Sequence, residues 1–191
     1  MTLFDRLLGR TSSEIADNEL EPPHAQRVLR MLTVQYRMHH KIMQWSSDEL
    51  YHGRLTADAS VSEHLLCQLP GVQSTELTSV PLVLIDTAFC GMEEEAGSDS
   101  DLNSDSKSNA GEAELVILIL QQLLGAGVAA NDIALITPYN GQVELLRSKL
   151  AERYPALEIG SVDGFQGREK EAVVRQSIAG RPLRWWHTRA H

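Results

Sequence analysis

The sequence predicts an α/β fold with a doubly wound parallel sheet. Three observations predict it: short apolar runs alternate with amphipathic stretches of helical length, turn residues separate the two, and 42% of the 191 residues are hydrophobic. A chain of this length can bury one core, so we expect one main domain. The longest apolar run, Leu115–Leu120, is far shorter than the ~20 residues of a membrane helix, so no membrane partner is expected.

The N-terminal part is expected to hold a helix, a linker and a first strand–helix pair. Residues 1–26 combine an amphipathic stretch with a polar, Pro-containing segment that indicates a linker. Val28–Val34 has the apolar and β-branched content of a strand. In His39–Leu50 the apolar residues recur at helical spacing, which predicts a helix.

The middle of the chain predicts a buried strand followed by an acidic loop. Val80–Asp86 is almost continuously apolar, as in a strand covered on both faces. A disordered loop over 92–110 should follow, because its six carboxylates and one lysine give −6 + 1 = −5 of the total charge of −9. The rest of the chain carries only −4, so the acidic total does not exclude a nucleic-acid binder.

The C-terminal half predicts regular alternation of helices and strands, and hence parallel pairing with right-handed crossovers. Its helices and strands are expected at Gly111–Leu124, Ile133–Thr137, Gly141–Arg153, Leu157–Val162 and Ala172–Val174. Charged residues, Gly and Pro then interrupt the pattern, so 175–191 is expected to be a divergent tail.

Several kinds of chemistry find no support in the sequence. It has no Gly-Lys dipeptide, so it lacks a P-loop and cannot assemble an ordinary NTPase site alone. Asp86 could bind magnesium or simply end a core strand. His39 and His40 are adjacent and should point apart on a helix, and Cys67 and Cys90 form no C-x-x-C pair. No metal site is therefore predicted, and the cysteine usage indicates a reducing compartment.

Two clusters place unusual polar groups at the ends of elements. Gln35–His40 combines an aromatic ring with a guanidinium, a pair that suits a nucleotide but could equally be a packing ring and a surface cation. Ser161–Glu171 holds Gly164 and Gly167 in a sharp turn that could present amides to phosphate or ribose, or could be only a tight loop.

These clusters resemble two motifs of one helicase family. LTVQYRMH resembles motif IV and SVDGFQGREKEAVV resembles motif V of superfamily 1 helicases of the nonsense-mediated-decay type, in particular those of the immunoglobulin mu-binding protein 2 type. ALITPYNGQVELL resembles the segment between them, and the resemblance covers most of residues 27–173. It implies a second RecA-like domain over 27–174, incomplete at its C-terminus, that closes on a first RecA-like domain around ATP and Mg²⁺.

The resemblance also implies roles for individual residues. Tyr36 would stack on adenine, Arg37 would reach the γ-phosphate as the catalytic cation, and Glu169 would bind the ribose, with Gln166 and Gly167 in the same nucleotide-facing turn. Single-stranded DNA or RNA would lie along an edge made by Thr137, Pro138, Tyr139, Ser161 and Val162.

The sequence departs from the family pattern at both ends. Walker A, Walker B and motif VI have no counterpart, so the chain alone is expected to be inactive. Three interpretations stay open: the C-terminal motor domain of an ATP-dependent helicase of nucleus and cytoplasm, an inactive form that binds nucleic acid or partners, and an unrelated α/β domain. In the tail, Trp185 and Trp186 could stack on bases or belong to an unrelated segment.

Overall fold

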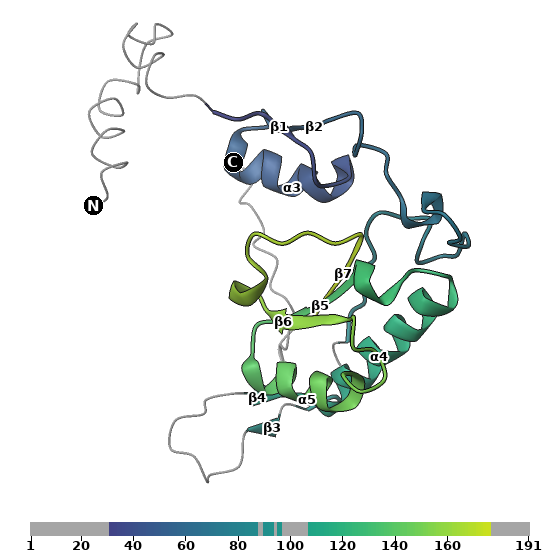
Figure 1. Ribbon diagram of the computed structural model, residues 1–191. Helices are drawn as coiled ribbons and strands as arrows, with labels where there is room; N and C mark the ends of the chain where they lie inside the picture. The colour runs from purple at the N-terminus through teal and green to yellow at the C-terminus, as the bar shows by residue number, and fades with distance from the viewer. Residues whose placement is uncertain (1–30, 88–89, 94, 97–106, 177–191) are drawn as a thin grey trace, which may run out of the picture.

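A computed structural model describes residues 31–87, 90–93, 95–96 and 107–176 (Figure 1). The helix and linker expected over 1–26 lie outside the described residues, as do most of the expected acidic loop and the tail after Gln176. In the part of the chain that is described, no helix is long and apolar enough to cross a membrane.

A three-stranded parallel sheet forms the centre of the fold. Its order is β6 (Glu158–Ser161), β5 (Ile133–Thr137) and β7 (Ala172–Arg175), and β5 pairs in parallel with both neighbours. Four of the five β5 residues are buried, as expected for an apolar strand between two others. The predicted α/β class and the parallel sheet are confirmed.

Two helices cover one side of this sheet: α4 (Ala110–Gly125) and α5 (Asn140–Leu150) (Figure 1). The α4 helix begins where the Asn109 side chain accepts a hydrogen bond from the Glu112 N–H, as a typical N-cap does. A single core of buried apolar side chains joins helices and sheet, including Val116, Leu120, Leu123, Ile133, Leu135, Val143, Leu146, Leu150 and Ile159. Hydrophobic burial therefore holds this part together.

A smaller unit lies on the other side of the sheet (Figure 1). It consists of β1 (Val34–Gln35), α3 (His40–Tyr51) and β2 (Thr56–Ala57), with β1 and β2 paired in parallel. The buried Ser47 hydroxyl donates to the Leu55 carbonyl at 2.9 Å and thereby ties α3 to the strand that follows it. The predicted helix is confirmed within one residue, but β1 contains only Val34 of the strand predicted over Val28–Val34; residues 31–33 form no strand, and 28–30 lie outside the described residues.

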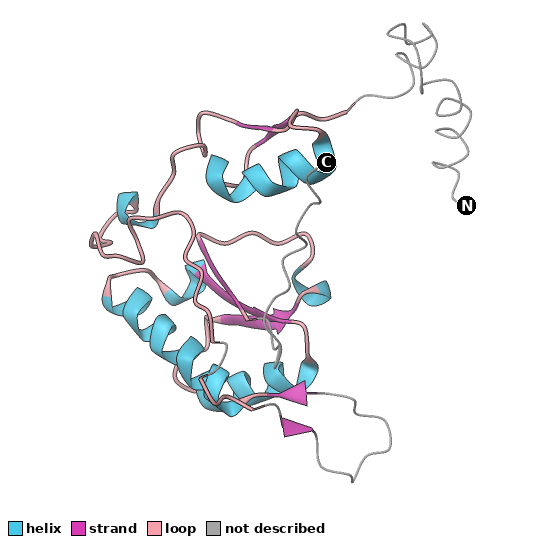
Figure 2. Ribbon diagram, turned by 180° about the vertical axis from the view of Figure 1, so that it is seen from behind, coloured by secondary structure: helices cyan, strands magenta, loops and turns pink. Residues whose placement is uncertain are grey.

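The strand predicted over Val80–Asp86 is wrong. Among the described residues this segment pairs with no strand, and it is drawn as a loop that runs past β7 (Figure 2). Its apolar side chains are exposed rather than covered on both faces, with Leu82 at 67% and Leu84 at 69%. The composition suits a buried strand, but in the described part of the chain the segment joins no sheet, so no ladder covers its side chains.

The remaining boundaries differ from expectation by a few residues. At the two ends of the expected acidic loop, β3 (Glu95–Ala96) pairs antiparallel with β4 (Lys107–Ser108). Arg175 belongs to β7, so the sheet extends one residue into the expected tail. The described residues also include the short 3₁₀ helices η1 (Leu66–Gln68), η2 (Ala130–Asp132) and η3 (Asp163–Phe165).

Gly127 ends α4 in a conformation that other residues resist, and its replacement should destabilise the fold. Its φ is 100°, and a Cβ there would clash with the Gly71 carbonyl oxygen. Gly127→Ala should therefore lower the free energy of unfolding by about 2 kcal/mol. Urea denaturation measures this, with Gly125→Ala as control, because a Cβ on Gly125 meets no atom within 4 Å. Equal midpoints for the two variants would contradict the prediction.

Candidate functional site

The candidate site is a rim where two distant segments of the chain meet. The Arg37 Nε lies 2.9 Å from the Glu169 Oε2, and the two side chains stay 63% and 70% exposed. Tyr36 is also exposed, and all three residues line one cavity. The structure thus brings together the aromatic ring, the guanidinium and the carboxylate that the sequence analysis selected.

Gln35 fixes the turn that presents Tyr36 and Arg37. Its side-chain oxygen accepts hydrogen bonds from the backbone N–H groups of Arg37 at 2.8 Å and Met38 at 2.7 Å. Its amide nitrogen donates to the Met38 carbonyl at 2.6 Å. One side chain therefore satisfies three backbone groups between β1 and α3, and the two following side chains project outward. Sequence reasoning gave Gln35 no role.

Glu169 follows a turn held by a buried ring. Phe165 in η3 is 8% exposed, and its carbonyl accepts the Arg168 N–H at 3.1 Å. Between them, Gly167 has a φ of 84°, which favours glycine. Gln166 and Gly167 are exposed on this turn. Of the three residues predicted to face the nucleotide here, Glu169 lines the cavity, whereas Gln166 and Gly167 do not.

Charged neighbours anchor the same turn to β6. The Glu158 carboxylate lies 2.9 Å from the Lys170 Nζ and 3.1 Å from an Arg168 nitrogen. The hydrogen bond from Lys170 is the main cause that lowers the pKa of Glu158, so this carboxylate stays ionised to lower pH than usual. The two cations flanking Glu169 are therefore held back against the sheet.

The predicted nucleic-acid edge lies at the carboxyl ends of β5 and β6. Thr137 and Ser161 are neighbours in register there, and Pro138 and Val162 are exposed beside them. Tyr139 is partly buried. In open α/β sheets ligands bind at this end of the strands, where the strand order reverses.

Thr137 does not fit the expectation that its hydroxyl contacts a ligand. The residue is fully buried, and its Oγ1 has no hydrogen-bond partner among the described atoms. The exposed part of the edge is therefore formed by the other four residues.

A buried polar network lies behind this edge, and sequence reasoning missed it. The Gln142 side chain accepts from the Asn109 N–H at 2.8 Å and donates to the Asn109 carbonyl at 3.1 Å and to the Gln176 Oε1 at 3.0 Å. Gln176 in turn donates to the Glu112 carboxylate at 2.8 Å. The network joins the start of α4, the start of α5 and the end of β7. A glutamine on the apolar face of a predicted helix was the available signal.

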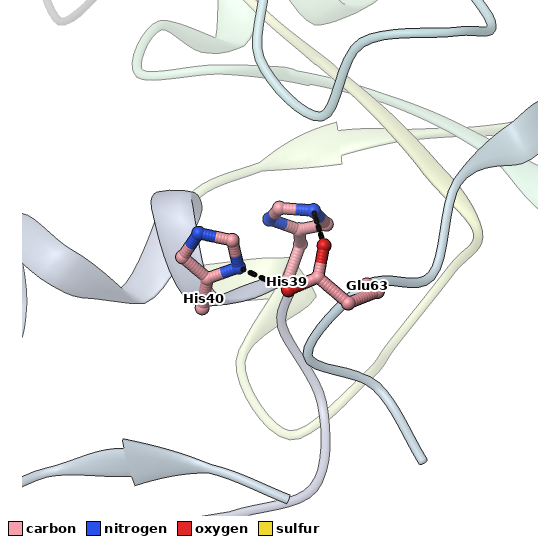
Figure 3. Close-up of side chains that lie close together, drawn as sticks. All are labelled: His39, His40 and Glu63. Atoms are coloured by element: carbon pink, nitrogen blue, oxygen red, sulfur yellow. Dashed lines mark ion pairs between the residues drawn. The ribbon is translucent and has the colours of Figure 1, made fainter. Parts of the chain in front are cut away.

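His39, His40 and Glu63 form a cluster that sequence reasoning excluded. Figure 3 shows the Glu63 carboxylate facing both rings, with oxygens 3.9 Å from the His39 Nε2 and 3.2 Å from the His40 Nδ1. The rings stack at 4.4 Å because His39 is the N-cap of α3 and not helical. The expectation that adjacent histidines point apart was therefore wrong.

The hydrogen bonds of the cluster favour hydrogen bonding between the histidines and Glu63 over binding of a metal ion. The His39 Nδ1 accepts the Lys41 N–H at 3.1 Å, so a neutral ring carries its proton on Nε2, the atom facing Glu63. The His40 Nδ1 lies 2.8 Å from the Ser62 carbonyl, which leaves its proton on that nitrogen. Neither facing nitrogen offers a lone pair, and a metal ion would have to displace both contacts.

His39 should make stability depend on pH. Burial is the main cause that lowers its pKa from 6.5, followed by the charge of His40. The unfolded chain binds the proton first as pH falls, so stability should decline below about pH 6.5. His39→Asn keeps a capping side chain and should reduce the loss of urea midpoint between pH 7.5 and 5.5. The exposed His52→Asn variant should keep the full loss, and a wild-type loss in His39→Asn would contradict the prediction.

Parallel strands around β5, with paired side chains from two segments at one rim, define a RecA-like α/β domain. The sequence matches the family described as AAA domain over residues 2–180, and the chain belongs to that family. Its relatives place it among superfamily 1 helicases of the immunoglobulin mu-binding protein and nonsense-transcript type. The family resemblance predicted from the motifs is confirmed.

Three relatives illustrate the similarity. DNA-binding protein SMUBP-2 of Rattus norvegicus is 59% identical over 155 residues, which are 81% of this chain and 15% of the relative. DNA polymerase alpha-associated DNA helicase A of Schizosaccharomyces pombe is 42% identical over 80% of this chain and 23% of its own length. Regulator of nonsense transcripts 1 homolog of Drosophila melanogaster is 35% identical, with coverage of 77% and 12%. The chain thus spans less than a quarter of each relative.

Proposed function

We propose that this chain is the second, C-terminal motor domain of an ATP-dependent nucleic-acid helicase. The observation that carries the proposal is the Arg37–Glu169 pair at 2.9 Å, which joins the motif IV and motif V segments at one exposed rim. The names of the relatives, which include DNA helicases and a DNA-binding protein, support the same class of activity. The protein would act in nucleus and cytoplasm.

The chemistry of the rim fits a nucleotide held between two domains. Tyr36 offers a flat ring for adenine, Arg37 a planar fork for the γ-phosphate, and Glu169 a carboxylate for the ribose hydroxyls. Nucleotide binding would replace the Arg37–Glu169 pair with contacts to phosphate and ribose. We place Mg²⁺ and the phosphate loop on a first RecA-like domain, because this sequence has no Gly-Lys dipeptide.

Nucleic acid would cross the other edge of the sheet. Pro138, Tyr139, Ser161 and Val162 present main-chain groups, a ring and one hydroxyl at the carboxyl ends of β5 and β6. Such contacts position a single strand and do not read its sequence.

Adding a first RecA-like domain tests the proposal. The purified chain with magnesium-ATP should show no turnover, whereas the two domains together should bind ATP. Tyr36→Ala should weaken that binding about tenfold or more, and Arg54→Ala, an exposed cation outside the site, should leave it unchanged. Failure of the assembled domains to bind ATP would reject the assignment.

A second candidate function is an inactive form that binds nucleic acid or partners of the full helicase. The missing phosphate loop in this sequence favours it. Single-stranded oligonucleotide should then bind the chain alone, with affinity falling by about 0.7 log units per log unit of salt for each phosphate contacted. Fluorescence anisotropy from 20 to 200 mM salt measures this slope. Absence of binding at low salt would exclude this candidate.

A further inference from the structure

A second polar pair joins the segments that meet in the Arg37–Glu169 pair. The His64 Nε2 lies 2.9 Å from the Glu171 Oε2, and each of these two side chains is 40% exposed. Glu171 comes two residues after Glu169 and directly precedes β7, whereas His64 lies 107 positions earlier in the chain. All four side chains line the same cavity, so two contacts join the motif V segment to the part of the chain that carries motif IV.

The segment that carries His64 is itself tied to the motif IV turn. At its start, the Asp58 N–H donates to the Gln35 carbonyl at 2.9 Å. Near its end, the Ser62 carbonyl accepts the His40 N–H at 3.1 Å and lies 2.8 Å from the His40 Nδ1. Backbone contacts at both ends therefore fix the position of His64 relative to the turn that begins at Gln35 and ends at His40.

Apolar packing contributes little to the alignment of the two motifs at the rim. The cavity that both motifs line has a volume of about 1070 Å³. Close-packed interiors contain few voids larger than a water molecule, so side chains of the two motifs do not interlock across a gap of this size. Polar contacts across the cavity must therefore set the position of Glu169 relative to Arg37.

Nucleotide binding would remove one of these contacts. With Arg37 on the γ-phosphate and Glu169 on the ribose hydroxyls, the pair at 2.9 Å is lost when the site fills. The contact between His64 and Glu171 competes with neither group. Its Nε2 carries a proton in the imidazolium and in one neutral tautomer, so the ring can donate to the carboxylate in both states. This contact therefore persists when the first one opens.

We propose that His64 and Glu171 are positioning residues of the nucleotide site, which hold Glu169 at the ribose after nucleotide has replaced the pair at the rim. The inference rests on the proposed function. The neighbouring Lys170 contacts Glu158 of β6 at 2.9 Å and thereby anchors the same segment to the sheet. The contact from His64 supplies the second constraint, which sets the position of the segment relative to the motif IV turn.

The ribose selectivity of the chain assembled with a first RecA-like domain tests the proposal. The wild-type assembly should bind ATP about tenfold more tightly than 2′,3′-dideoxy-ATP, because hydrogen bonds to a carboxylate are among the strong ones. In His64→Ala this ratio of affinities should fall about threefold or more, since Glu169 is no longer held at the hydroxyls. Titration calorimetry with each of the two nucleotides measures the ratio.

His64→Gln is the matched variant. Its amide nitrogen extends about as far as the imidazole Nε2 and also donates, so the ratio should stay close to that of the wild type. His52→Asn replaces an exposed histidine after α3 and should leave the ratio unchanged. An unchanged ratio in His64→Ala would overturn the proposal even if ATP bound more weakly, because damage to the fold alone weakens both nucleotides equally. A ratio as low in His64→Gln as in His64→Ala would also overturn it.

A double-variant cycle shows whether the two residues act through one contact. Glu171→Ala should lower the ratio as much as His64→Ala does, and the combined variant should lower it no further. Additive losses would overturn the proposal.

The outcomes separate this inference from the proposed function. If the wild-type assembly binds ATP and His64→Ala keeps the wild-type ratio, this inference fails and the helicase function stands. Failure of the wild-type assembly to bind ATP would reject the proposed function itself. Equal affinity of the wild type for both nucleotides would remove the ribose contact of Glu169, and this inference with it.

Discussion

Replacing Arg37 by alanine should lower ATP turnover of the chain assembled with a first RecA-like domain by about a thousandfold. An arginine that meets the transferring phosphoryl group is worth at least this factor, which corresponds to about 4 kcal/mol of transition-state stabilisation. Arg37 can take this role because it is 63% exposed at the rim and its ion-pair partner Glu169 is 70% exposed, so both side chains are accessible to a nucleotide. Steady-state turnover at saturating ATP measures the effect.

Two controls separate this effect from damage to the fold. Exposed ion pairs contribute little to stability, so Arg37→Ala should keep the wild-type urea midpoint. Arg37→Lys keeps a positive charge but loses the planar fork, and it should recover only a small part of the turnover. Turnover within threefold of wild type in Arg37→Ala would remove Arg37 from the reaction.

The sequence predicted those helices and strands whose bounds depend on residues close together in the chain. The strand β5 and the helix α4 appear within one residue of their predicted bounds, because apolar periodicity and local caps define them. The rim was predicted only through the family resemblance. Nothing in composition shows that Arg37 and Glu169 meet at 2.9 Å, since their contact depends on the tertiary arrangement.

The predictions that were wrong concern residues whose structure depends on distant or neighbouring elements. Val80–Asp86 has the composition of a core strand, but a strand also needs partners on its edges, and the described chain supplies none. For His39, the sequence placed a helix boundary one residue too early, and this moved the ring from an N-cap onto a helical face. Each error concerns a property that the neighbouring structure determines.

Replacing Gln142 by methionine should lower the free energy of unfolding by about 3 kcal/mol. The side chain is fully buried, and the substitution keeps its volume while removing all three of its hydrogen bonds. The Asn109 N–H and the Gln176 Oε1 would lose this partner inside the core, and each unsatisfied group costs about 1–3 kcal/mol, whereas the Asn109 carbonyl keeps the Ala113 N–H. Urea denaturation followed by circular dichroism measures the loss.

Gln121→Met is the matched control, because it makes the same chemical change on the exposed side of α4. It should alter the free energy of unfolding by no more than about 0.5 kcal/mol. The difference between the two variants isolates the buried network from helix propensity. This network joins the end of β7 to the starts of α4 and α5. Gln142→Met should therefore also weaken binding of nucleic acid at the edge formed by β5 and β6. Equal midpoints for the two variants would show that the network does not stabilise the fold.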